Sequence, residues 1–235
     1  MKKTIQRVLA AVILFAMILS GGFSEVGKVH AEKQQGTTKR AIYVVFDNSG
    51  SMYGDGNKAW SQATYAMEVF AAMMNYESGD VMKVFPMHDI TTDGNTGSAT
   101  KSSMEIRGKD DIAQIHNMYT PKPGGTPYTQ VNNAAGELTK LLNAGSVDEG
   151  WLVVLTDGDF DNDIPASGLK ADLEGKAAAN ENLYVQYLAI GTDVKNIPEG
   201  NADKGLYAQK AGNTSEVVNE LAEISNRIFK RNEYA

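Results

Sequence analysis

The sequence predicts an α/β fold: a doubly wound, mostly parallel central sheet flanked by helices, with one edge strand allowed to run antiparallel. Two observations lead to this prediction. Segments with strand and helix patterns alternate along the chain from residue 40 onward. The strongest strand candidates, residues 40–46 and 151–155, are apolar almost throughout. Such strands are typical of parallel sheets that helices cover on both faces.

The first half of this pattern contains three strands and one long helix. Residues 40–46 are rich in β-branched and aromatic side chains, which favours a buried strand. Residues 60–75 are rich in Ala and Met with apolar positions at helical spacing, which predicts a helix. Residues 80–87 predict a second strand. A third strand is expected at 104–107, after the Gly-, Thr- and Ser-rich loop 91–100.

The middle of the chain continues the alternation. Residues 110–118 predict a short helix, and residues 126–143 predict a longer helix whose Val, Ala and Leu side chains share one side. Residues 151–155 form a near-continuous apolar strand. A helix at 166–180 and a strand at 183–190 follow.

Two elements close the fold. Residues 205–209 predict a last edge strand, and residues 215–231 predict an amphipathic helix. The sequence contains no internal repeat and no indication of a second domain. We therefore expect one domain at residues 40–235, preceded by a polar linker at residues 32–39.

The N-terminal segment has the pattern of a secretory signal peptide. It starts with basic residues, continues with an apolar run at 8–19, and has small residues at positions 29 and 31. The pattern predicts a signal peptide at residues 1–31 and a protein that is secreted, extracellular or at the cell surface. An uncleaved N-terminal membrane anchor is the alternative interpretation; no later stretch is apolar enough to insert into a membrane.

Composition excludes several classes of function. The chain has no cysteine, so it has no disulfide framework and no thiolate metal site. Its formal net charge is −7. An acidic chain argues against a nucleic-acid partner and against binding to an anionic membrane face, because both depend on clusters of Lys and Arg.

The most informative motif directly follows the first predicted strand. Asp47, Ser49 and Ser51 stand at two-residue steps. In an extended backbone alternate side chains point the same way, so the three side chains are expected to converge on one point. One carboxylate and two hydroxyls suit a small hard cation such as Mg²⁺, which prefers oxygen ligands.

Two other loops can add oxygen ligands at the same edge of the sheet. The first is the Gly-Gly-Thr126-Pro loop, and the second is the Thr-Asp157-Gly turn after the strand 151–155. Each has a purely structural explanation, since Thr126 before Pro127 resembles a helix N-cap and Asp-Gly is a common turn. Ligands bind at the carboxyl ends of the strands in open α/β sheets, so the combination favours a shared cation site.

These three segments together resemble the metal-ion-dependent adhesion site (MIDAS) of von Willebrand factor type A (vWA) domains, and the resemblance spans residues 40–231. It implies that Ser49 and Ser51 bind Mg²⁺ or Mn²⁺ directly. It implies that Thr126 binds directly or through water, and that Asp47 and Asp157 hold the ion mostly through water. The remaining coordination position is then filled by an acidic side chain of a protein partner.

The expected function is therefore that of an extracellular adhesion module without enzymatic activity. It would recognise a protein or another carboxylate-bearing ligand through the bound ion. One alternative is a metal-dependent hydrolase on a similar sheet, which would need a general base or nucleophile beside the ion. The other is a chelatase-type assembly subunit, against which the signal peptide argues.

The acidic run at 157–163 needs a separate explanation. Its acids alternate along the chain, but it lacks the Gly and Glu positions of an EF-hand calcium loop. A solvated acidic rim is favoured over a second cation site. Such a rim would repel acidic proteins that do not reach the metal.

Overall fold

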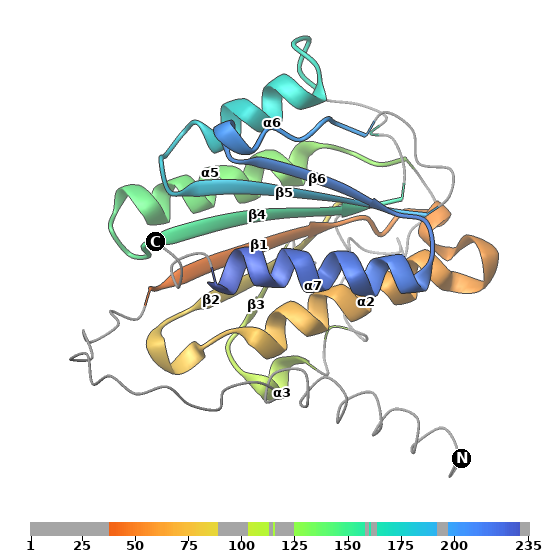
Figure 1. The fold of residues 1–235 in the computed structure, drawn as a ribbon, viewed down its shortest axis with the longest axis horizontal. Helices are drawn as coiled ribbons and strands as arrows, with labels where there is room; N and C mark the ends of the chain where they lie inside the picture. Colours follow the sequence, from red (N-terminus) through yellow and green to blue (C-terminus); the bar gives the residue numbers. More distant parts are fainter. Residues whose placement is uncertain are drawn as a thin grey trace, which may run out of the picture. The chain divides into compact units, whose positions relative to one another are not determined.

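A six-stranded sheet with the order β3-β2-β1-β4-β5-β6 forms the centre of the molecule (Figure 1). The computed structural model describes residues 38–88, 103–112, 115, 125–157, 160, 164–191 and 197–230. The strands are β1 (Arg40–Phe46), β2 (Val81–Pro86), β3 (Met104–Ile106), β4 (Glu149–Thr156), β5 (Leu183–Ile190) and β6 (Leu206–Ala211). All neighbouring pairs are parallel except β2 and β3. The predicted mostly parallel sheet with an antiparallel edge is confirmed.

Helices cover both faces of this sheet. The α-helices are α2 (Gly54–Met73), α3 (Lys109–Ile112), α5 (Thr129–Asn143), α6 (Leu169–Ala177) and α7 (Thr214–Lys230). Short 3-10 turns are η1 (Gly50–Tyr53), η2 (Tyr76–Ser78) and η3 (Ala202–Lys204). Figure 1 shows α2 and α7 in front of the sheet, with α5 and α6 behind it.

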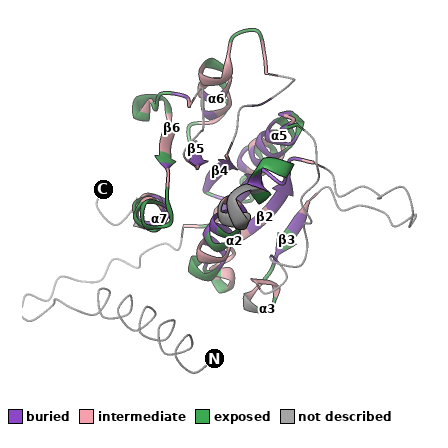
Figure 2. Ribbon diagram, turned by 90° about the vertical axis from the view of Figure 1, so that its right-hand side faces the viewer, coloured by how far each residue is buried: buried purple, intermediate pink, exposed green. Residues whose placement is uncertain are grey.

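The alternation of side chains along the strands divides the core into two layers. On β1, Ile42 and Val44 face the layer that contains Met67 of α2 and Leu221 of α7. Their neighbours Tyr43 and Val45 face the layer under α5 and α6. Figure 2 shows β2 and β4 as mostly buried ribbons, the edge strand β6 as less buried, and exposed residues on the helices. Two covered faces explain why β1 and β4 are apolar almost throughout.

Several helix boundaries differ from the sequence predictions. The predicted helix at 60–75 begins earlier, at Gly54, because the chain enters it directly from the η1 turn. The predicted helix at 126–143 begins at Thr129, with Tyr128 at the N-cap position and no side-chain cap. Thr126 is therefore not the helix N-cap that its position before Pro127 suggests.

Of the predicted helix at 110–118, the structure has α3 at Lys109–Ile112, and positions 113, 114 and 116–118 lie outside the described residues. The other predicted elements shift by three residues or less. The strands at 40–46 and 183–190 have the predicted bounds, whereas β4 and β6 are longer and α6 is shorter than predicted. The predicted signal peptide (1–31) and most of the linker (32–39) lie outside the described residues. Within the described part of the chain, no helix is both long and apolar enough to cross a membrane.

Candidate metal site

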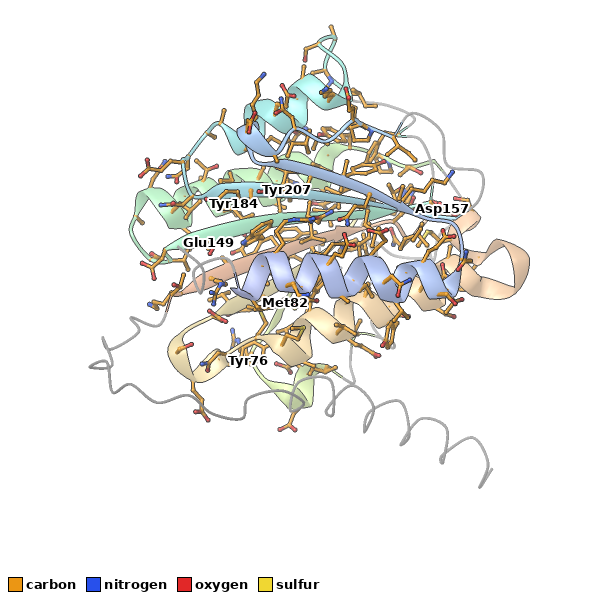
Figure 3. All side chains as sticks on the ribbon, in the orientation of Figure 1. Tyr76, Met82, Glu149, Asp157, Tyr184 and Tyr207 are labelled. Carbon is orange, nitrogen blue, oxygen red and sulfur yellow. The ribbon has the colours of Figure 1, made fainter. Side chains whose placement is uncertain are left out.

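The candidate site lies where the strand order of the sheet reverses. Strands β1 and β4 are parallel neighbours, and the chain leaves them toward opposite sides of the sheet. The backbone N–H of Asp47 donates to the carbonyl of Leu155 at 2.8 Å, which carries the pairing one residue past the end of β1. Figure 3 shows Asp157 at this edge, with Glu149 at the opposite end of β4. Crevices at such switch points are the usual ligand sites of open α/β sheets.

Asp47 is completely buried, and neutral donors orient its carboxylate. Oδ1 accepts the backbone N–H of Ser49 at 2.8 Å. Oδ2 accepts the hydroxyl of Thr156 at 2.8 Å and that of Thr126 at 3.5 Å. Three segments of the chain therefore meet at one carboxylate.

The two serines converge, but through a turn and not through extended backbone. Ser49 is buried, whereas Ser51 is exposed and lies in the 3-10 turn η1. Their Oγ atoms are 2.8 Å apart. The predicted convergence is present, and the alternation argument that led to it is wrong for Ser51, because the chain turns after Ser49.

Asp157 closes the cluster from the end of β4. Its Oδ1 accepts the hydroxyl of Ser51 at 3.0 Å. Burial and, next, the negative charge of Asp47 together raise the pKa of Asp157 to about 6, against the opposing effect of the hydrogen bond from Ser51. Two carboxylates that repel one another at a protein edge favour a cation between them.

The structure brings Thr126 to this cluster as well. Thr126 is 5% exposed, and its hydroxyl faces Asp47. This contact explains why the residue does not cap α5: its side chain points toward the carboxylate. All five predicted site residues, Asp47, Ser49, Ser51, Thr126 and Asp157, are thus linked by hydrogen bonds.

Sequence analysis missed three residues that support the site. Thr156 hydrogen-bonds to Asp47. The buried amide of Asn48 pairs with the backbone of His88, donating to its carbonyl at 3.1 Å and accepting its N–H at 2.8 Å. The Nε2 atom of His88 contacts the carbonyl of Gly125, beside Thr126. The sequence signal for Thr156 is a hydroxyl residue directly before the strand-end acid.

The donor set fits a hard divalent cation. The cluster offers three hydroxyls and two carboxylates, and Mg²⁺ and Mn²⁺ prefer such oxygen ligands. Among the described residues, no group of three or more His, Cys, Asp or Glu side chains could hold a metal ion. A cation held here would therefore depend on the serine and threonine hydroxyls as much as on the acids. Within the predicted acidic rim, positions 158, 159 and 161–163 lie outside the described residues.

Comparisons with known proteins identify the fold. No family model and no curated protein matches the chain. Proximal thread matrix protein 1 from the mussel byssus is similar, with a TM-score of 0.53, 14% identity and coverage of 80% of this chain. A structure of that protein with a zinc-occupied MIDAS motif gives a TM-score of 0.51 and 15% identity over 80% of this chain.

A bacterial structure is similar to the same extent. The pilus adhesin SpaC from Lactobacillus rhamnosus GG has a TM-score of 0.54 and 17% identity over 85% of this chain. The chain spans 48% of the mussel protein and 32% of SpaC, which is less than half of each. The class of fold is therefore that of vWA domains. At these identities the likeness concerns the fold alone.

Proposed function

We propose that this protein is an extracellular binding module that recognises an acidic side chain of a protein partner through a divalent cation. The observation that carries the proposal is the meeting of five oxygen-bearing side chains at the switch point of the sheet. They come from three separate loops and are joined by contacts of 2.8–3.5 Å. A fold needs no such convergence of hydroxyls and acids at one edge.

The five residues would bind the ion in different ways. Ser49 and Ser51 would bind Mg²⁺ or Mn²⁺ directly, Thr126 directly or through water, and the two aspartates mostly through water. Neutral hydroxyl ligands leave the dication undercompensated, so it attracts a further carboxylate. The outer carboxylates orient the waters and hydroxyls around it. A partner's Asp or Glu would fill the open position.

The similar structures support this proposal in two respects. SpaC is a pilus adhesin, and the mussel protein belongs to the byssus matrix and has been seen with a zinc-occupied MIDAS motif. The predicted signal peptide at residues 1–31 also fits an extracellular protein. The acidic net charge of −7 fits a protein partner better than a nucleic acid.

Binding without catalysis fits the contacts of the site. A hydrolase on this sheet would need a general base near a nucleophile or a water. The hydroxyl of Ser51 donates to Asp157, and the His88 ring contacts the Gly125 carbonyl. Neither contact creates a serine–histidine pair.

A calorimetric titration with Mg²⁺ and with Mn²⁺ tests the proposal. We expect saturable binding of one ion per chain, which is lost in Asp47→Asn. In a pull-down with the immobilised chain, partner proteins from the surroundings of the cell should be retained in the presence of Mg²⁺ and released by a chelator. Failure of the chain to bind either ion would overturn the proposed function.

A further inference from the structure

The ring of Tyr128 lies between the two outer loops of the candidate site. Tyr128 stands two residues after Thr126, at the start of α5, and is completely buried. Its edge-to-face partner is Phe160, with ring centroids 4.8 Å apart and an interplanar angle of 83°. Phe160 is 8% exposed and stands three residues after Asp157. One aromatic contact thus joins the Thr126 loop to the Asp157 loop.

The hydroxyl of Tyr128 is fixed to a third element. It donates to Oδ2 of Asp172 in the first turn of α6 at 2.6 Å. Lys176, one helical turn further, lies 2.7 Å from the same oxygen and places its Nζ 5.4 Å from the Tyr128 ring centroid. Side chains of Asp172 and Lys176 are only 16% and 13% exposed. A hydrogen bond to a shielded carboxylate is stronger than one between neutral groups.

The hydroxyl of Tyr128 is not needed to fill the core. Tyr128 belongs to the apolar layer under α5 and α6, where a phenylalanine would fill the same space. Its buried phenol needs a hydrogen-bond acceptor, and Asp172 supplies one at 2.6 Å. The pairing with a charged residue of α6 therefore points to a role in placing the loops.

We propose that Tyr128 is a positioning residue that holds the Thr126 and Asp157 loops at the spacing the metal site needs, with α6 as its fixed support. This inference rests on the proposed function. Phe160 and Asp172 are its two partners: the first joins the loops to each other, and the second joins them to the helix. Replacing side chains that orient metal ligands typically weakens metal affinity by about 10- to 100-fold.

Tyr128→Phe tests the inference, with Tyr76→Phe as the matched control. Tyr76 also donates its hydroxyl, to the Ala71 carbonyl at 2.9 Å, and Figure 3 shows it away from Asp157. Both variants lose one phenol hydrogen bond. Two measurements are compared: amide exchange of the metal-free protein in peptides containing Thr126 and Asp157, and calorimetric affinity for Mn²⁺.

We expect faster exchange in both peptides and about tenfold weaker Mn²⁺ binding for Tyr128→Phe, and neither change for Tyr76→Phe. Unchanged exchange and unchanged affinity in Tyr128→Phe would overturn the positioning role. The proposed function would still stand in that case if the wild-type protein binds Mn²⁺. A wild-type protein that binds no Mn²⁺ would instead overturn the proposed function, and the exchange result alone would then decide whether Tyr128 holds the loops.

Two further variants separate positioning from general stability. Asp172→Asn keeps an oxygen that accepts the phenol, so we expect near wild-type affinity, whereas Asp172→Ala should match Tyr128→Phe. Phe160→Leu keeps apolar volume but removes the ring contact, and it should also weaken Mn²⁺ binding. Equal affinities for Asp172→Ala and Asp172→Asn would contradict the inference.

Discussion

Ser51→Ala offers the sharpest separation of binding from folding at the candidate site. Ser51 is exposed, and its hydroxyl contacts only Ser49 and Asp157 within the described site, at 2.8 and 3.0 Å. Removing an exposed hydroxyl should change the free energy of unfolding by no more than about 0.5 kcal/mol. Asp47, by contrast, is buried and accepts three hydrogen bonds, so its removal perturbs the fold as well.

The expected loss of metal affinity in Ser51→Ala is much larger than this stability change. Even residues that only orient metal ligands typically contribute about 10- to 100-fold in affinity. A direct ligand should contribute at least that much, which corresponds to about 1.4–2.8 kcal/mol of binding free energy. Removing the Ser51 hydroxyl should therefore lower the metal affinity strongly and leave the free energy of unfolding almost unchanged.

Calorimetric titration with Mg²⁺ and urea unfolding in the presence of a chelator measure the two quantities. Ser78→Ala is the matched control, since its hydroxyl donates to the Asn75 carbonyl at 2.9 Å in η2. We expect Ser78→Ala to bind Mg²⁺ as the wild type does. A Kd for Ser51→Ala equal to that of the wild type, with binding intact in the control, would refute the assignment of Ser51 as a ligand.

Three other changes give distinct outcomes. Asp157→Asn removes one of two mutually repelling carboxylates, so unfolding in chelator should need more urea while Mg²⁺ affinity falls; a drop in both would contradict this account. Thr126→Val should weaken Mg²⁺ binding, whereas Thr126→Ser, which keeps the hydroxyl, should retain it; calorimetry showing equal losses would exclude a role for the hydroxyl. Burial raises the pKa of Tyr43 from 10.0 to about 12, so the phenol ionises less readily in the folded state than in the unfolded state. The raised pKa contributes fully to the free energy of unfolding below about pH 10. This contribution, at most about 2.7 kcal/mol, is lost as the pH rises towards about 12. Urea midpoints of wild type and Tyr43→Phe measured across this range should converge or cross; parallel curves would disprove the linkage.

The sequence was most informative where side chains are buried on both faces. Strands β1 and β5 begin and end at the predicted residues because their runs of apolar residues stop at Asp47 and at Gly191. Helix starts were predicted less well. Gly54 and Gly56 are poor helix formers, yet α2 begins at Gly54, because the preceding η1 turn already sets the direction of the chain.

At the candidate site, too, residue patterns predicted which side chains lie together, whereas contacts between distant segments could not be predicted. The residue types and strand-end positions of Asp47 and Asp157 suffice to place them at one edge, since parallel strands end together. Contacts made across the fold carry no comparable pattern. Nothing in the sequence around Asn48 indicates its pairing with His88, and nothing around Tyr128 indicates its bond to Asp172. The role of the five residues as metal ligands stays a prediction.

The buried acids of this fold differ in how their charges are compensated. Glu149 is buried with Arg40 3.6 Å away, and Asp80 accepts two backbone N–H groups at 2.9 Å. Asp47 is buried beside Asp157, and among the described residues neither forms an ion pair. Only neutral hydrogen-bond donors compensate the buried charge of Asp47, and the second carboxylate nearby increases the cost of that charge. The proposed site accounts for this pair, because a divalent cation bound there would offset both costs. Asp157 should therefore lower the stability of the metal-free protein and yet be needed for metal binding.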